Sequence, residues 1–444
     1  MVRMQISKVK LHKSIVFTII VLSVFIDLLN GYLNYYKSFP LPIGVVFRTI
    51  ITLFGFFYLL VNPKLFIYKT YVGGVFLLWV FCNAFWTLNS QDIDLALELS
   101  LFAKILYPLI IIFYIKYVID KGYVPFERVL KWMVLNGLIC GLSILFSYIT
   151  GIGFSTYGYG ETGSSYGFGT TSFFKAQNDL TLSMLLSFCI SLYFLFLTKK
   201  FLNLLKACFI LIGLILIGTR AGLLGGFALI FFFIIHMLFL AKGYGPKKLL
   251  LKFTMFTLIL AFATFSGIFA YNKIRENPYM IKKYAISALQ SPREVLSDAA
   301  NSYIDKTEKN TGYFLFGLGN KTYASALPLA SGVHKSNDEN EKTAEKDFTD
   351  LIGGYGIIFA LFVFALPLIV FIKLFKNWLS DTKDALKFSL FIAIALFLFH
   401  SIFAGHGIKN PQVGTLLSIV YIYGFVTGNR SKAEIQACDK VLKD

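Results

Sequence analysis

Charged residues are scarce in this chain. Only 15% of its 444 residues are Asp, Glu, Lys or Arg, whereas 57% are hydrophobic and the mean hydropathy is +0.69. So few polar side chains cannot cover the exterior of a water-soluble domain. The composition therefore excludes a soluble globular protein and predicts a membrane protein.

Cysteines and common cofactor motifs are also few or absent. The sequence contains no HExxH metal motif, no Walker phosphate-binding motif and no GxGxxG followed by an acidic residue at the expected distance. We therefore expect neither a metal ion nor a cofactor. The five cysteines fall in predicted membrane spans or in the C-terminal tail, which leaves no pair for a disulfide outside the membrane.

The hydrophobic residues form runs of about 20, the length with which a helix crosses the hydrocarbon core of a bilayer. Because lipid offers no hydrogen-bond partner to free backbone groups, helices are the expected spanning elements. We predict an all-α, polytopic transmembrane bundle of about twelve spans. Their predicted bounds are 14–33, 42–62, 71–89, 97–119, 130–150, 177–197, 201–218, 220–241, 250–272, 350–372, 386–404 and 411–428.

Basic residues outnumber acidic ones, and the formal net charge is +18. Topology explains this excess better than nucleic-acid binding, because the basic residues lie mainly in short connections between spans. With the N-terminus in the cytoplasm every inner connection is basic, as the positive-inside rule requires. An even number of spans then predicts that both termini are cytoplasmic. The residues concerned are Lys64, Lys69, Lys116, Lys121, Arg128, Lys199, Lys200, Lys242, Lys247, Lys248, Lys373, Lys376 and Lys383.

Two outer connections are long, and function is expected there. The connection at 151–176 is rich in Gly and Tyr, and Tyr157 and Tyr159 can stack on sugar rings and hydrogen-bond through their hydroxyls. A plain connector with tyrosines at the membrane interface explains the same composition.

The predicted spans and the second long connection divide the chain into four parts. They are 1–272 for nine spans, 273–349 for an extracytoplasmic cap, 350–428 for three spans and 429–444 for a cytoplasmic tail.

The cap has a nearly balanced charge, with 11 Lys and Arg against 9 Asp and Glu between Lys273 and Lys346. This balance is typical of a folded segment rather than of a disordered one. A cap helix at 293–305 is predicted because Ser291 and Pro292 are helix-start residues. Arg293 opens that helix, where it can bind an anion or form a surface ion pair.

Arg220 lies at the predicted outer boundary between the seventh and eighth spans, among glycines and an alanine that allow close helix packing. A guanidinium is always charged and offers forked donors that suit phosphate oxygens. An arginine that extends to the lipid headgroups is the alternative interpretation.

Acidic residues precede the tenth predicted span. Asp347 and Asp350 are three apart and share a helical face, where either can bind an arginine or accept a proton from a sugar hydroxyl. Glu345 and His334 precede them and are further candidates. Acids favoured by the dipole at a helix N-terminus are the structural alternative.

The connection between the last two spans brings His406 and Lys409 to the same predicted side. Two histidines six residues apart, His400 and His406, do not make a metal motif. Four further ionisable residues lie within earlier spans, and pairing between helices or an interfacial position is expected for each. They are Asp27, Arg48, Glu98 and Lys104.

The succession of five segments resembles the superfamily of O-antigen polymerases and O-antigen ligases. It covers roughly 205–428, whereas the first half matches only in its hydrophobic spans. The segments are TRAGLLG at 219–225, SPRE at 291–294, LFGLG at 315–319, EKDFTDLIGGYGIIF at 345–359 and AGHGIKNPQVG at 404–414.

The resemblance implies a GT-C-like glycosyltransferase at the outer face of the bacterial inner membrane, acting on glycans linked to undecaprenyl diphosphate. Arg220 and Arg293 match the two arginines that engage the donor diphosphate, and fixed cations stabilise the charge that gathers on such a leaving group. An acceptor base is expected among Glu345, Asp347, Asp350 and His406. Membrane lipids and a chain-length regulator are the other expected partners.

O-antigen polymerases and ligases are expected to differ in the residue that follows a loop histidine. His334 is followed by Lys335, whereas ligases commonly place Asn, Ser or Gln there, and the EKDFTD segment resembles polymerase-like members. We therefore predict polymerisation of lipid-linked repeat units into O-antigen or capsule-type polysaccharide. Transfer to a lipid A core and the flipping of lipid-linked oligosaccharides remain the alternatives.

Overall fold

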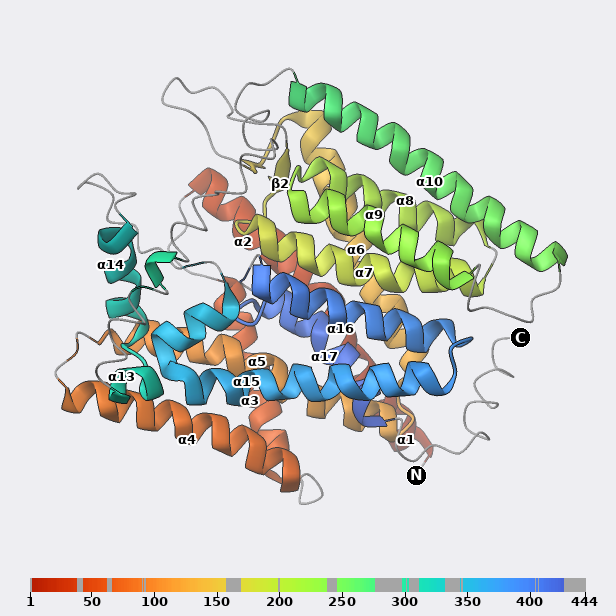
Figure 1. The fold of residues 1–444 in the computed structure, drawn as a ribbon. Coiled ribbons are helices and arrows are strands. Elements are labelled where there is room, and N and C mark those ends of the chain that lie inside the picture. The colour runs from red at the N-terminus through yellow and green to blue at the C-terminus, as the bar shows by residue number, and fades with distance from the viewer. Residues whose placement is uncertain are drawn as a thin grey trace.

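The structure, a computed structural model, is a bundle of long helices that run between two ends of the molecule (Figure 1). It describes residues 2–37, 43–61, 66–89, 91, 93–156, 169–198, 200–237, 246–275, 298–300, 302, 311–331, 344, 346–403, 405 and 407–426. The first helices are α1 (Val2–Phe17), a π-helical turn η1 (Thr18–Leu22), α2 (Ser23–Lys37), α3 (Ile43–Val61), α4 (Phe66–Leu88), α5 (Leu95–Asp120) and α6 (Phe126–Thr150). The others are α7 (Gln177–Leu197), α8 (Phe201–Leu216), α9 (Arg220–Ile235), α10 (Pro246–Arg275), α13 (Thr311–Phe316), α14 (Asn320–Ser331), α15 (Asp347–Ser380), α16 (Ala385–Phe403) and α17 (Pro411–Val426).

Eight helical segments of the described chain are long and apolar enough to cross a membrane. They coincide with predicted spans one to six, ten and eleven, which confirms an all-α polytopic membrane protein. Helices α8 and α9 are apolar but shorter, and α10 and α17 occupy the predicted spans 250–272 and 411–428 without being among the eight. The predicted count of twelve spans and the folded cap are therefore not confirmed.

The helices begin where the sequence supplies capping groups. The Asp94 carboxylate accepts hydrogen bonds from the backbone N–H groups of Ala96 and Leu97, both at 3.0 Å, at the start of α5. Thr219 does the same for Gly222 at the start of α9, at 3.1 Å. Such caps satisfy backbone donors that have no partner within the helix.

Helix α7 forms the centre of the bundle. Its most apolar stretch is 94% buried, and it packs against α6, α8, α9, α16 and α17. Small residues permit some of this packing: a methyl group added at Gly141 of α6 would overlap the backbone of Phe209 in α8. Close backbone approach through small residues is the usual way in which membrane helices associate.

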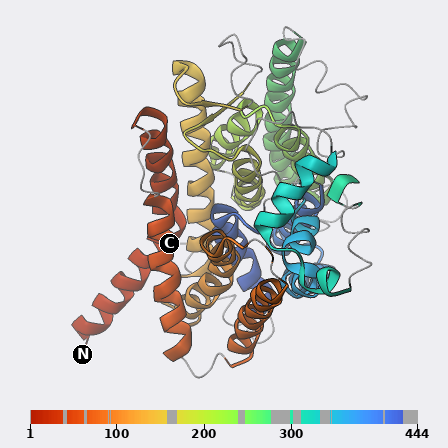
Figure 2. The same ribbon diagram turned by 90° about the vertical axis from the view of Figure 1, so that its left-hand side faces the viewer.

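The short helices α13 and α14 lie at one end of the bundle, beside the first turn of α15 (Figure 1). We call this end the α13–α14 end. Figure 2 looks onto it and shows α13 and α14 on the opposite side of the bundle from α1 and α2.

A junction of glycines joins α13 to α15. Gly356 has non-helical angles, φ 84° and ψ 169°, which interrupt α15. The interruption lets the carbonyls of Gly353 and Gly354 accept hydrogen bonds from the N–H groups of Leu318 and Gly319, both at 3.0 Å. The FGLGN segment at 316–320 is therefore docked on the start of α15.

The connection at 151–176 is held at its base by a two-stranded antiparallel sheet. Strand β1 (Phe154–Ser155) pairs with β2 (Thr170–Ser172), with Phe154 opposite Ser172 and Ser155 opposite Thr170. Tyr157 and Tyr159 lie outside the described residues. The predicted cap helix 293–305 lies almost wholly outside them as well.

Candidate functional site

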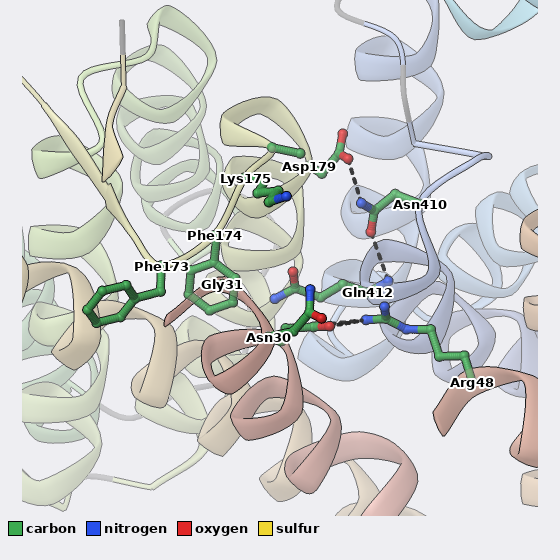
Figure 3. Close-up of a pocket in the computed structure, with 11 residues that line it drawn as sticks. Asn30, Gly31, Arg48, Phe173, Phe174, Lys175, Asp179, Asn410 and Gln412 are labelled. Carbon is green, nitrogen blue, oxygen red and sulfur yellow. Dashed lines mark hydrogen bonds and ion pairs between the residues drawn. The ribbon is translucent and has the colours of Figure 1, made fainter. Parts of the chain in front are cut away.

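A polar cavity lies between helices from the two halves of the chain. Its volume is about 160 Å³, and α2, α3, the segment before α7 and the start of α17 contribute to its lining (Figure 3). The polar side chains in this lining are Asp27, Asn30, Arg48, Lys175, Asp179, Asn410 and Gln412. Ionisable groups inside a membrane bundle are costly, so such a cluster is a candidate functional site.

Two carboxylates of the cavity are held by defined partners. Arg48 Nη2 donates to both oxygens of Asp27, at 2.7 and 2.5 Å, so the pairing expected for these residues is confirmed. Asp179 Oδ2 accepts a hydrogen bond from Asn410 Nδ2 at 2.5 Å. The side-chain oxygen Oδ1 of Asn410 accepts from the N–H groups of Gln412 and Val413, and thereby caps α17.

A second polar group joins α5, α14 and the connection before α17. Glu98 is 1% exposed, and its two oxygens accept from the backbone N–H and the side-chain amide of Asn320, at 2.6 and 2.7 Å. Lys409 Nζ donates to the amide oxygen of the same asparagine at 3.3 Å. Lys409, a candidate from the sequence, therefore lies at the α13–α14 end.

Asp347 holds the connection between α16 and α17. Its Oδ2 accepts hydrogen bonds from Ser401 Oγ at 2.7 Å and from the N–H groups of Gly407 and Ile408 at 2.8 and 3.2 Å. The carboxylate is 1% exposed. It positions the backbone that leads directly to Lys409 and Asn410.

Asp350 lies one helical turn further along α15. It accepts a hydrogen bond from the N–H of Ala344 at 2.8 Å. Burial, and after it the charge of Asp350, raise the pKa of the Tyr323 phenol in α14, which keeps that hydroxyl protonated at neutral pH.

Arg220 is the first residue of α9, and its side chain is half-buried. The preceding residue, Thr219, lies 3.0 Å from Thr181 of α7, between the two hydroxyl oxygens. Thr181 follows Asp179 by two residues. Arg220 therefore begins a helix whose start contacts the start of α7.

The structure brings together part of the predicted site. Asp347, Asp350, Lys409 and Arg220 all lie at the α13–α14 end. The other candidates, Arg293, His334, Glu345, His406, Tyr157 and Tyr159, lie outside the described residues.

Several site residues were not found from the sequence, namely Asp179, Lys175, Asn410, Gln412 and Asn320. The sequence did contain a signal for Asp179. This residue lies at the predicted outer start of a span, as Asp347 does. The amides and Lys175 gave no such signal, because their importance depends on contacts between distant segments.

The site contains carboxylates and, beside them, two lysines that form no ion pair with a carboxylate of the described residues. Within the part of the chain that the structure describes, neither Lys104 nor Lys409 forms an ion pair with a carboxylate. Lys104 lies within electrostatic range of Lys409, Arg48 and Asp179. Uncompensated cations can bind an anionic group, and a nearby carboxylate can accept a proton. The described residues contain no group of three His, Cys, Asp or Glu that could hold a metal ion.

Comparison with known proteins gives one family. The family model described as "O-antigen ligase like membrane protein" matches residues 9–309. The match includes the first half of the chain, in which the motifs gave only hydrophobic spans, and it ends before the segments at 345–359 and 404–414. A search of curated proteins finds no match.

Proposed function

Because the chain belongs to the family of O-antigen ligase like membrane proteins, we propose that it joins lipid-linked glycan units into a polysaccharide. The family supports a membrane enzyme of O-antigen or polysaccharide assembly. The observation that carries the proposal is the collection of buried carboxylates, uncompensated lysines and Arg220 at a single end of the bundle. A transferase that acts on an anionic lipid donor needs both kinds of group in one place.

The donor is a glycan on undecaprenyl diphosphate, and Arg220 and Arg293 bind its diphosphate. The position of Arg220 supports this role, since the positive end of the α9 dipole and the N–H groups of its first turn favour an anion there. When the sugar leaves, negative charge gathers on the diphosphate, and a fixed guanidinium lowers the barrier. The role of Arg293 rests on the resemblance.

The acceptor is the next lipid-linked repeat unit, which makes the enzyme a polymerase. The resemblance of EKDFTD to polymerase-like members supports this choice. Transfer to a lipid A core is the second candidate, since the matching family model is named after ligases. Glu345, Asp347, Asp350 and His406 are the sources of the base expected from the sequence, and Asp347 also holds the connection at 407–408.

The α13–α14 end faces away from the cytoplasm of the bacterial inner membrane, and both termini are cytoplasmic. The opposite end supports this orientation, because Lys116, Lys131, Lys373 and Lys376 lie near it, as the positive-inside rule requires. A chain-length regulator is a proposed partner.

The test compares glycans in a strain that lacks the gene and is complemented with variants. We expect Arg220→Ala and Arg293→Ala to leave single lipid-linked repeat units, with a loss of at least about 100-fold in long chains. Arg128→Ala, near the opposite end, is the matched control and should give normal chains at equal membrane abundance. Normal chain length in both arginine variants would overturn the assignment.

The same experiment separates the alternatives. In the deletion strain, a polymer that forms but stays on its lipid carrier identifies a ligase. Lipid-linked units that stay on the cytoplasmic face identify a flippase, because a flippase moves its substrate without altering chain length.

A further inference from the structure

The cavity between α2, α3, α7 and α17 has no role in binding the donor diphosphate as proposed above. Its volume of about 160 Å³ equals that of roughly five water molecules in the liquid. This is the scale of one sugar ring and not of a whole oligosaccharide. The cavity therefore suits the terminal sugar of a glycan.

The lining offers the groups that recognise a sugar. Asp179 accepts hydrogen bonds, the amides of Asn30 and Gln412 both donate and accept, and Lys175 donates. Phe173 and Phe174 add apolar ring surface. Sugar hydroxyls are both donors and acceptors, so this mixture matches them better than it matches a phosphate or an apolar chain.

The segment that carries the aromatic rings is fixed against α2. A methyl group at Gly31 would overlap the carbonyl oxygen of Phe173, so the α2 backbone and this segment are in direct contact. Phe173 also packs edge-on against Tyr32, with ring centroids 5.3 Å apart. The wall of the cavity is thus held before any ligand binds, which lowers the cost of ordering it.

Asp179 has a fixed orientation within the cavity. The amide group of Asn410 cannot rotate without losing the two hydrogen bonds that its oxygen accepts from Gln412 and Val413. Its nitrogen consequently stays directed at Asp179 Oδ2. A carboxylate has about four acceptor positions, and Asp179 is 8% exposed and lines the cavity.

Asp179 and the proposed donor site lie at the starts of two helices that pack together. The hydroxyl contact between Thr181 and Thr219 joins the first turn of α7 to the first turn of α9, where Arg220 stands. A donor whose diphosphate binds Arg220 therefore lies at the same end of the bundle as the cavity.

We propose that this cavity binds the terminal sugar of the acceptor glycan and that Asp179, in place of the four bases expected from the sequence, accepts the proton of the attacking hydroxyl. The hydroxyl oxygen forms the new bond to the anomeric carbon of the donor sugar. The bond from that carbon to the diphosphate oxygen breaks, and its electron pair leaves on the diphosphate. The hydroxyl proton moves to the Asp179 carboxylate, so that charge and atoms balance. This inference rests on the proposed glycosyltransferase function.

The experiment uses the full chain in lipid nanodiscs. The donor is the lipid-linked repeat unit extracted from the deletion strain, and the acceptor is the same oligosaccharide released from its lipid. Asp179→Asn keeps an oxygen that can accept from Asn410 and should therefore fold. We expect its transfer rate to fall at least about 100-fold. Asp120→Asn, an exposed carboxylate at the other end of α5, is the matched control and should leave the rate unchanged.

Lys175→Ala tests the cavity independently, since Lys175 is exposed at its mouth and its loss should not disturb folding. The acceptor KM should rise roughly tenfold with little change in kcat. A rise confined to the donor KM would assign the cavity to the diphosphate and overturn the inference. Equal rates for Asp179→Asn and Asp120→Asn would overturn the role of Asp179.

Failure of the inference is distinct from failure of the function. If the wild-type protein transfers no sugar from the lipid-linked donor to the released oligosaccharide, the proposed function fails. If the wild type is active and Arg220→Ala is impaired while Asp179→Asn is not, the proposed function stands and only this inference fails.

Discussion

The two ends of the bundle use the same ionisable side chains in opposite ways. At the α13–α14 end, Glu98, Asp179, Asp347 and Asp350 are 1%, 8%, 1% and 3% exposed. Each accepts from an amide, a hydroxyl or a backbone N–H. At the other end, the carboxylates pair with lysines at the surface, as in Lys116–Asp120, Lys131–Glu127 and Lys387–Asp381.

The two ends differ in the free-energy cost of placing their carboxylates in the folded protein. Exposed ion pairs form at little cost and contribute little, whereas a buried carboxylate loses its hydration and needs complete hydrogen bonding. Within the described residues Lys409 forms no ion pair with a carboxylate, so it can serve an anionic substrate. The α13–α14 end is organised for binding, and the opposite end for solubility and orientation.

The largest effect is expected from breaking the glycine junction that shapes the α13–α14 end. Alanine at Gly356 would have to adopt φ 84° and ψ 169°, and its methyl group would overlap the Leu315 carbonyl. This region of backbone space is nearly restricted to glycine, so we expect a loss of about 3 kcal/mol. Thermal unfolding in detergent measures it.

Gly73→Ala is the control for that substitution. Gly73 lies within α4, and a methyl group there meets no atom within 4 Å. The variant should be as stable as the wild type or slightly more so, because alanine favours a helix. An equal loss in both variants would show that the junction has no special role.

We expect substitution of Asp347 to cause an intermediate loss of stability. The size of this loss tests whether a buried acid contributes more than an exposed one. Asp347→Ala removes the acceptor for Ser401, Gly407 and Ile408. Leaving buried donors without a partner should cost about 2 kcal/mol, and the displaced connection before α17 should also reduce polymer formation. Unfolding temperature and chain-length distribution are the measurements.

Asp384 provides the matched acid at the opposite end. It accepts from the N–H groups of Leu386 and Lys387 at the start of α16, an ordinary helix cap worth about 1 kcal/mol. Asp384→Ala should therefore lower stability by about half as much and leave polymer formation normal. Loss of polymer in this variant would remove the functional distinction between the two ends.

The sequence predicted the spans well because each apolar run determines its own helix. Pairing between helices was one of two expectations for Asp27 and for Arg48, and the two residues pair with each other. The same reasoning could not find the partners of Glu98 or Asp179, which are 222 and 231 residues away in Asn320 and Asn410. Such contacts arise only when the helices pack.

The glycine segments illustrate the same limit. The glycines of LFGLG and EKDFTDLIGGYGIIF do not reveal that the carbonyls of Gly353 and Gly354 accept hydrogen bonds from the N–H groups of Leu318 and Gly319. The candidate acids before the tenth span were identified from their position alone. Their separate roles, with Asp347 holding one connection and Asp350 contacting Ala344, depend on the tertiary structure.

The smallest effect is expected at the exposed ion pair between Lys116 and Asp120, whose side chains are 18% and 42% exposed. A double-mutant cycle with Lys116→Ala and Asp120→Asn should give a coupling of about 0.2 to 1 kcal/mol, reduced further by salt. Unfolding in detergent at low and high ionic strength measures it. A salt-insensitive coupling as large as the loss at Asp347 would contradict the contrast, because it would mean that a carboxylate paired in water contributes as much as one hydrogen-bonded inside the bundle.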